Sequence, residues 1–288
     1  MRALRTTFLL TALTLVLMLL GSYWGGRTGM TIALGFAVVM NMFAYFFSDQ
    51  IALRSSGARP VSREEMPRLY AVVERLAGKA NIPMPKLYVV PEAAPNAFAT
   101  GRNPRHASVA VTEGLLKLMD DDELEGVIGH ELSHVRNYDI LISSVAATIA
   151  GAITYLSSIT RWGLMFGGGR DDDRESGGGG GILGIIVLLL APLAALLLQL
   201  MISRQREYSA DATGARMVGY PDGLIRALQK LGAYNSRIPT TAITPTTSTL
   251  CIVKPLFGSR GLSSLFSTHP PLEDRIAALR EMTVIPQR

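Results

Sequence analysis

The segment His130-Glu131-Leu132-Ser133-His134 carries the clearest chemical pattern in the sequence. Histidines four residues apart project from the same face of a helix, about one turn from each other. Two imidazoles placed in this way can ligate one Zn²⁺, and the glutamate beside the first can act as a general base. The pattern also uses two of the only four histidines in the chain. We therefore predict a zinc site on a helix that contains this segment.

A catalytic zinc site needs a third protein ligand, because it keeps its fourth position open for water. The candidates elsewhere in the chain are His106, His269, Cys251, Glu207 and Asp211. The two acids are four residues apart on a predicted helix, so one could bind the metal while the other accepts the free N–H of a ligating imidazole. Their spacing alone leaves the choice open, because two acids on a solvated helix surface would look the same.

Zinc and Glu131 together would permit hydrolysis of a peptide bond. Zinc lowers the pKa of a bound water to about 7 and polarises the scissile carbonyl, while the glutamate takes the proton and returns it to the leaving amine. A further donor would stabilise the charge that develops on the carbonyl oxygen. Asn96 and His269 are the candidates for this donor, although a turn asparagine and a histidine at a helix start are simpler interpretations. His106 stays ambiguous, since it could simply open a strand.

Four segments resemble the HtpX-type membrane zinc metalloproteases, which are relatives of the eukaryotic C-a-a-X prenyl-protein endopeptidases. These segments are residues 123–134, 207–211, 96–101 and 268–271. The resemblance extends over nearly the whole chain. It implies His130, His134 and Glu207 as the ligands of one zinc ion per chain, Glu131 as the catalytic residue and Asp211 as the support of a ligand.

The same resemblance implies that Asn96 and His269 contact the substrate. It also implies a protease of the bacterial inner membrane with its active site on the cytoplasmic side. Its substrates would be damaged membrane proteins and unfolded proteins, cleaved in quality control under stress. We expect no nucleic-acid partner, and no ATP because the sequence has no nucleotide-binding glycine motif.

The composition supports a membrane protein. Of the 288 residues, 48% are hydrophobic and only 18% charged, against a charged share of about 25% in soluble domains. This apolar composition also excludes a disordered chain. The net charge of +5 would suggest nucleic acid in a soluble domain, but in a membrane protein Lys and Arg gather beside the spans on the cytoplasmic side. The single cysteine, Cys251, cannot form an internal disulfide, which fits a cytosol-facing protein.

Four apolar stretches, uncharged apart from Arg5 near the start of the first, approach the length of roughly 20 residues that a membrane-spanning helix needs. They are residues 4–23, 30–47, 140–159 and 182–202. A cleaved signal peptide is the alternative for the first, but no small-residue cleavage site follows it. The flanks expected to face the cytoplasm contain Arg2, Arg5, Arg54, Arg59, Arg63, Arg204 and Arg206. The loop 160–181 has mixed charges and ends in a run of five glycines, residues 177–181, which is typical of a flexible tether.

We then expect transmembrane hairpins at 1–53 and 140–202, with both termini on the cytoplasmic side. One cytoplasmic catalytic domain would form from the segments 54–139 and 203–288. We expect helices at 62–80, 206–218, 221–231 and 271–281, and through 124–132 after the caps Asp120, Asp121 and Asp122. Short strands are expected at 87–90, 97–100 and 108–112. The run 107–112 is the candidate edge strand to which an extended substrate could add.

The sequence thus predicts a mainly α-helical integral membrane protein with four transmembrane helices and a cytoplasmic α+β, zincin-like (gluzincin) catalytic domain with a small β-sheet. A narrow processing peptidase of the prenyl-protein kind is the first alternative, with the same chemistry and a defined substrate. A zinc transporter or scaffold is the second. It is disfavoured because the predicted spans contain no Asp, Glu, Lys or His to mark an ion path, and their one arginine, Arg5, lies near the start of the first span.

Overall fold

The computed structural model describes residues 2–141, 143, 145, 204–237 and 270–282. The predicted span at 182–202, most of the span at 140–159 and the loop between them lie outside these residues. Cys251 and His269 also lie outside them. Predictions about these parts of the chain therefore stay predictions.

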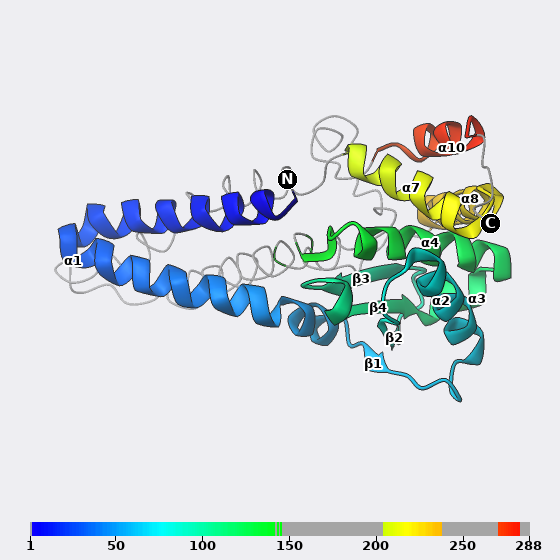
Figure 1. Cartoon of the computed structure of the whole chain (residues 1–288), viewed down its shortest axis with the longest axis horizontal. Helices are drawn as coiled ribbons and strands as arrows, with labels where there is room; N and C mark the ends of the chain where they lie inside the picture. The colour runs from blue at the N-terminus through cyan, green and yellow to red at the C-terminus, as the bar shows by residue number, and fades with distance from the viewer. Residues whose placement is uncertain (1, 142, 144, 146–203, 238–269, 283–288) are drawn as a thin grey trace, which may run out of the picture.

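The chain begins with a long helical hairpin, α1 (Arg2–Ser55), which covers both of the first two predicted spans. Two glycines break the helix, and Gly26 has a φ of 56°, a conformation that glycine adopts at little cost. The two arms then run back along each other (Figure 1). Asn41 Nδ2 donates to Thr14 Oγ1 across them at 2.9 Å. Within the described residues, Gly25–Ser55 is the one helix long and apolar enough to cross a membrane.

A four-stranded sheet follows, in the order β1-β2-β4-β3. Its strands are β1 (Arg59–Pro60), β2 (Lys86–Val90), β3 (Ala97–Gly101) and β4 (Ala107–Thr112). β2 and β4 are parallel, whereas β1 pairs with β2 and β3 pairs with β4 in antiparallel fashion. The three predicted strands are confirmed, and β1 was missed because two residues give no periodic pattern.

The prediction that 107–112 lies at the edge of the sheet is wrong. β4 pairs with β2 on one side and β3 on the other, and all six of its residues are buried. Its weak polar/apolar alternation is the pattern of a strand covered on both faces, which is typical of the centre of a sheet. The strand at that edge is instead β3.

The helix predicted at 62–80 is shorter in the structure, α2 (Pro67–Ala80). Ser62 and Glu65 do bond each other reciprocally, with Ser62 N donating to Glu65 Oε2 at 2.7 Å and Glu65 N to Ser62 Oγ at 3.4 Å. These bonds close only a single turn, because a proline disfavours helical geometry in the residue before it. Met66 accordingly has a φ of −132°, and the helix starts at Pro67.

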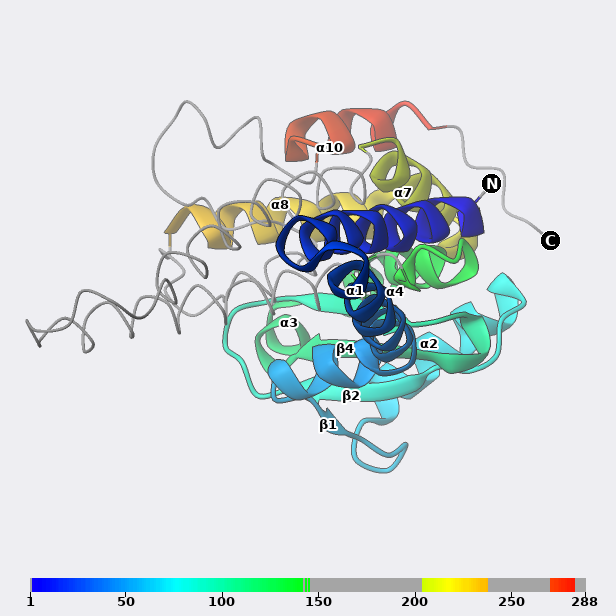
Figure 2. The same cartoon turned by 90° about the vertical axis from the view of Figure 1, so that its left-hand side faces the viewer.

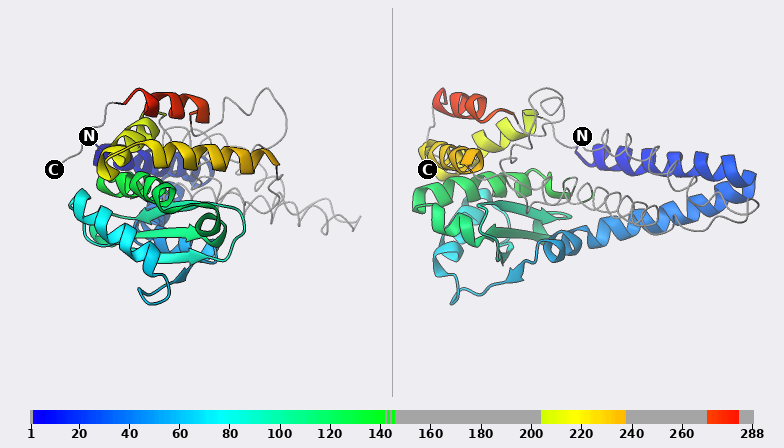
Figure 3. Two further views of the ribbon diagram at one scale, coloured as in Figure 1. Left: turned by 90° about the vertical axis from the view of Figure 1, so that its right-hand side faces the viewer. Right: turned by 180° about the vertical axis from the view of Figure 1, so that it is seen from behind.

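The remaining helices are α3 (Glu113–Leu118), α4 (Asp121–Arg136), α7 (Arg204–Val218), α8 (Asp222–Arg237) and α10 (Leu272–Arg280). All but α3 were predicted, with bounds within a few residues except at the C-terminal end of α8, which was predicted at residue 231 and lies at Arg237. α4 lies at the centre, between the sheet on one side and α7 and α8 on the other, and α10 packs on the outside of α7 and α8 (Figure 3). It begins with a capping box, in which Asp120 accepts from the Glu123 N–H and Glu123 accepts from the Asp120 N–H.

α4 crosses α7 at very short range because both helices have a glycine at the crossing. A Cβ on Gly214 would lie 2.8 Å from both the carbonyl carbon of Gly129 and the amide nitrogen of His130. Gly126 similarly allows the N-terminus of α8 to approach α4, since a Cβ there would lie 2.4 Å from the Leu224 amide nitrogen. These glycines let α7 and α8 pack directly on the backbone of α4.

The hairpin is joined to the sheet by a small apolar cluster. Ala52 and Leu53, near the end of α1, pack with Val90, Phe98 and Ala110 on strands β2, β3 and β4. Viewed along its length, the hairpin stands in front of the sheet and of α4 (Figure 2). The apolar hairpin and the sheet therefore share a packed contact.

Candidate metal centre

Two imidazoles of α4 face a common point. His130 and His134 lie one turn apart, and their Nε2 atoms are 3.2 Å from each other. His130 is only 1% exposed. Their rings meet edge to face with centroids 4.8 Å apart. Two ring nitrogens at this separation repel each other through their lone pairs unless a cation or proton lies between them.

Glu207, in the first turn of α7, completes the group. Its Oε2 lies 3.6 Å from His130 Nε2, and its Oε1 lies 3.7 Å from His134 Nε2. The three donor atoms all lie within 4.8 Å of one another. Of the third-ligand candidates in the described residues, the structure brings Glu207 to the histidines. His106 is exposed in the 3₁₀ turn η1 (Pro104–His106), where its Nδ1 lies 2.9 Å from Asn103 Oδ1.

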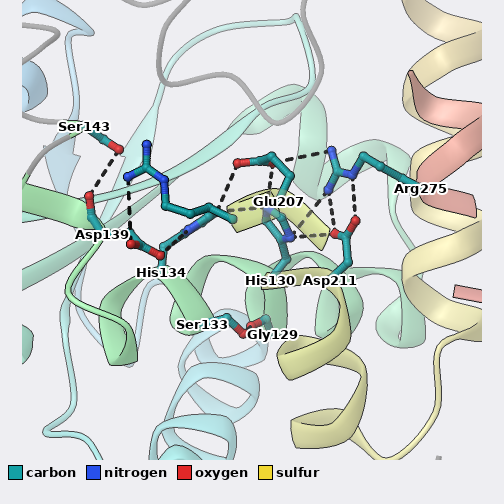
Figure 4. Close-up of polar contacts among 10 residues, drawn as sticks. Gly129, His130, Ser133, His134, Asp139, Ser143, Glu207, Asp211 and Arg275 are labelled. Carbon is teal, nitrogen blue, oxygen red and sulfur yellow. Dashed lines mark hydrogen bonds and ion pairs between the residues drawn. The ribbon is translucent and has the colours of Figure 1, made fainter. Parts of the chain in front are cut away.

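Asp211, one turn after Glu207, lies behind His130. Its Oδ1 is 2.8 Å from His130 Nδ1, the ring nitrogen that faces away from the common point (Figure 4). A carboxylate there fixes the proton on Nδ1 and leaves Nε2 as an electron-pair donor. Burial raises the pKa of Asp211, but the guanidinium of Arg275 outweighs burial and holds that pKa below its usual value.

Arg275 of α10 is a site residue that the sequence did not reveal. Its side chain is fully buried and donates to both carboxylate oxygens of Asp211, at 2.6 and 2.7 Å. Its Nη1 also lies 3.8 Å from Glu207 Oε2. An arginine on a short terminal helix gives no local signal, because its partner Asp211 lies 64 residues earlier in the chain.

Asp139 plays the corresponding part behind His134 and was also missed. Its Oδ2 lies 3.5 Å from His134 Nδ1. Burial lowers the pKa of His134, but the nearby carboxylates of Asp139, Glu207 and Glu131 outweigh burial and raise that pKa to about 9. Each imidazole thus has one ring nitrogen towards the common point and the other towards its own carboxylate.

Glu131 lies beside this group, on the side of α4 that faces the sheet. Its side chain is buried, and burial raises its pKa to about 7. The nearby His134 lowers that pKa and Glu207 raises it, while the backbone N–H of Ala99 on β3 donates to the carboxylate. A carboxyl with a pKa near neutrality can both accept and return a proton at cellular pH.

The structure describes the position of one of the two predicted substrate-contacting residues, Asn96, and substrate contact by either residue stays a prediction. Asn96 lies directly before β3, and its backbone exchanges hydrogen bonds with Thr112, donating to Oγ1 at 2.8 Å and accepting from the amide at 2.9 Å. This places Asn96 at one end of the edge strand that contacts Glu131. His269 lies outside the described residues, so its role stays a prediction.

The donor set fits a divalent transition metal. Two imidazole nitrogens and one carboxylate oxygen are the ligands of catalytic zinc sites, and hydrogen-bonded carboxylates behind the imidazoles are usual at such sites. The buried Arg275 compensates the negative charge of Asp211. The group could therefore hold one metal ion with three protein ligands.

The chain is similar to known proteases along nearly its whole length. The model of peptidase family M48 matches residues 63–283. A protease HtpX homolog of Desulforapulum autotrophicum is 54% identical over 276 residues, which is 96% of this chain and 88% of that protein. Another from Pelotomaculum thermopropionicum is 49% identical over 284 residues, covering 99% of this chain and 100% of that protein.

The fold is also similar to that of a larger solved structure. Ste24p of S. mikatae superposes with a TM-score of 0.52 at 21% sequence identity. The match covers 96% of this chain but only 64% of that chain. At this identity the similarity concerns the fold alone.

Proposed function

Because the chain belongs to peptidase family M48 and, within it, to the HtpX-type membrane-embedded metalloproteases, we propose that it is a zinc-dependent endopeptidase acting at the cytoplasmic face of a bacterial inner membrane. The single observation that carries the proposal is the convergence of His130, His134 and Glu207 beside the buried Glu131. Zinc is the metal that best suits two imidazoles and a carboxylate in a site that leaves a position open.

In the proposed site, His130, His134 and Glu207 hold the metal. Asp211 orients His130, and Arg275 in turn holds Asp211 through two hydrogen bonds. A zinc ion there would supply Lewis-acid polarisation of the scissile carbonyl and of the attacking water. Since the imidazoles are fixed from behind, the site is organised before substrate arrives, and little reorganisation accompanies the reaction.

Glu131 is the proposed general base and acid. Its carboxylate would accept the proton of the attacking water and pass it to the nitrogen of the leaving amine. Burial brings its pKa to about 7, so both protonation states are accessible near neutral pH. The Ala99 N–H holds the carboxylate on the sheet-facing side of α4.

We place the substrate along β3. A protease needs its peptide extended, because a helix hides its amide bonds in its own hydrogen bonds. β3 is an edge strand of the sheet, and its Ala99 amide contacts Glu131. A peptide added to this edge would pass beside the proposed base. Asn96 at the start of the strand, and His269, remain our candidates for contacting the peptide carbonyl.

The proposed location favours substrates in or at the bilayer. The apolar arm Gly25–Ser55 leads directly into the sheet, and Arg54 and Arg59 lie at this junction, as expected for a cytoplasmic flank. Damaged membrane proteins and some unfolded cytoplasmic proteins are therefore the proposed substrates. Their removal under stress would be a form of protein quality control.

The test compares the detergent-purified wild type with Glu131→Gln and Glu207→Ala. We measure zinc per chain and cleavage of casein and of an unfolded membrane protein. Glu131→Gln should retain zinc and lose about 10²-fold or more of the cleavage rate, because general acid–base catalysis contributes about that much. Glu207→Ala should lose both cleavage and metal affinity.

Three outcomes would contradict parts of the proposal. Full cleavage by Glu131→Gln would exclude that residue as the base. Unchanged zinc affinity in Glu207→Ala would exclude it as a ligand. Zinc in the wild type without cleavage of either substrate would favour the narrow processing peptidase over the quality-control protease.

A further inference from the structure

Asp139 is not one of the proposed metal ligands, but it contacts the ligand His134 from behind. Its side chain is 11% exposed, and its Oδ2 lies 3.5 Å from His134 Nδ1 (Figure 4). Its other oxygen lies 3.9 Å from Arg206 Nη1. A carboxylate in this place keeps the proton of His134 on Nδ1, which leaves Nε2 directed to His130 and Glu207.

The end of α4 is built so that Asp139 folds back over its own helix. The Asp139 N–H donates to the His134 carbonyl at 2.9 Å, and the Tyr138 N–H donates to the Val135 carbonyl at 3.1 Å. These two bonds form a Schellman cap, whose left-handed residue is usually glycine. Here that residue is Tyr138, with a φ of 60°. A tyrosine in this conformation is strained, and such strain is typical of sites where the backbone geometry is needed.

Arg206 connects Asp139 to the second helix of the metal centre. It lies in the first turn of α7, directly before Glu207, and its side chain is 13% exposed. The contact therefore joins the end of α4, which carries His134, to the turn of α7 that carries Glu207. Asp211 and Arg275 make a similar connection behind His130, from α7 to α10.

We propose that Asp139 is a positioning residue of the metal centre, which orients the His134 imidazole and, through Arg206, holds the end of α4 against the start of α7. The inference rests on the metal site proposed above. The turn at 137–139 would then affect metal affinity, although none of its residues is a proposed ligand.

A purely structural role for Asp139 has to be separated from this one. The residue directly precedes helical residues that begin at Ile140, and the Ser143 N–H donates to its carbonyl at 3.3 Å. Aspartate is a common residue before the first turn of a helix, where its side chain stabilises the helix start. Serine serves equally well as such a cap, but its side chain is too short to reach the imidazole.

The experiment uses the full chain in detergent and the variants Asp139→Ser and Asp139→Asn. We measure the zinc dissociation constant by competition with a chromophoric chelator, the visible spectrum of the Co²⁺-loaded protein, and thermal unfolding of the metal-free protein. Asp139→Ser should weaken zinc binding about 10- to 100-fold and alter the Co²⁺ spectrum. Loss of the 3.9 Å contact with Arg206 should lower the unfolding temperature of the metal-free protein only slightly. Asp139→Asn keeps a neutral acceptor and should lose less affinity.

Asp120→Ser is the matched control, because Asp120 caps the other end of α4. Among the described residues, the structure gives no contact between Asp120 and either imidazole. Asp120→Ser should leave the zinc affinity unchanged. Tyr138→Gly should also retain the affinity, because glycine adopts the left-handed turn readily.

An unchanged dissociation constant and Co²⁺ spectrum in Asp139→Ser would overturn the inference. A lower unfolding temperature with unchanged zinc affinity would assign Asp139 to helix capping and overturn it as well. If the wild type binds no zinc, the proposed metal site fails together with this inference. If the wild type binds zinc and the Asp139 variants bind it equally well, the metal site stands and this inference alone fails.

Discussion

Arg275 shows how much of the metal centre depends on a residue far from the proposed ligands. It is fully buried, and its two hydrogen bonds hold the carboxylate of Asp211 behind His130. Without the guanidinium, Asp211 and Glu207 would be two buried carboxylates on one turn of α7 with less positive charge near them. Burying an uncompensated charge is expensive, so the arginine allows two acids to occupy this place.

We predict that Arg275→Ala destabilises the protein by about 3–5 kcal/mol, the usual cost of removing one partner of a buried ion pair. Arg275→Lys should recover only part of the loss, because a lysine ammonium cannot reproduce the paired hydrogen bonds of a guanidinium. The measurement is thermal unfolding of the detergent-purified, metal-free protein. Arg280→Ala, an exposed arginine on the same helix, is the control and should change stability by less than about 0.5 kcal/mol. Equal effects at both positions would contradict this account.

At the scale of elements, α4 is the helix on which the site depends. Local sequence specifies its start through the capping box of Asp120 and Glu123. Its packing comes from the glycines that allow α7 and α8 to approach it. Both features act at a distance from the imidazoles, so each can be tested without altering a proposed ligand.

Asp120→Ala should lower the stability by about 1 kcal/mol at neutral pH, because it removes the side-chain cap.

The pKa of Asp120 is lowered mainly by the N–H of Glu123, with smaller contributions from Arg226 and Lys230. A carboxyl with a lowered pKa in the folded state contributes stability that is present above its unfolded pKa and is lost as the pH falls through the folded value. The stability difference between wild type and Asp120→Asn, which caps without titrating, should therefore shrink as the pH falls below about 4. The test is to measure the thermal unfolding midpoint of both proteins from pH 3 to pH 7, at intervals of about one pH unit. A difference that does not vary with pH would contradict it.

We also predict that Gly214→Ala weakens metal binding, although Gly214 is not one of the proposed ligands. The added Cβ would meet the backbone of Gly129 and His130 at 2.8 Å, so α7 must move away from α4 and take Glu207 with it. Zinc affinity measured by chelator competition should fall by about 10-fold or more, since small displacements of a ligand disturb its geometry. Gly78→Ala is the matched control, because a Cβ at Gly78 would meet nothing within 4 Å. Equal zinc affinity in both variants would show that the crossing has room for a methyl group.

At the scale of the whole molecule, the apolar hairpin and the catalytic part are connected by packing as well as by the chain. The cluster of Leu53 and Ala52 with Phe98 sits on β3, the strand whose Ala99 amide contacts Glu131. Movement of the hairpin against the sheet would therefore act on the strand beside the proposed base.

Leu53→Ala should test this connection. Leu53 is 6% exposed, and removing a buried leucine side chain usually costs about 2–5 kcal/mol. We expect a lower thermal unfolding temperature, measured in detergent by near-ultraviolet circular dichroism. Gln50→Ala, one turn earlier and exposed, should leave the unfolding temperature unchanged. If Leu53→Ala unfolds at the wild-type temperature, the hairpin and the sheet are energetically independent.

The sequence by itself determined the parts of this protein whose signals are local. The histidine pair needs only a spacing of four residues on a helix, and the cap at Asp120 and the three strands likewise depend on neighbouring residues. Where a local signal failed, a second local effect competed with it, as when Pro67 interrupted the helix signalled by Ser62 and Glu65.

Only the tertiary structure decided which distant side chains complete the site. Spacing alone left several third-ligand candidates, whereas the crossing of α4 and α7 brings Glu207 to both imidazoles and leaves His106 on an exposed turn. Arg275 gave no signal because its contacts depend on the docking of α10, and the sheet order that makes β3 the edge strand depends on how the strands pair. Pairing and docking are set by burial summed over many residues, so no short segment of the sequence contains them.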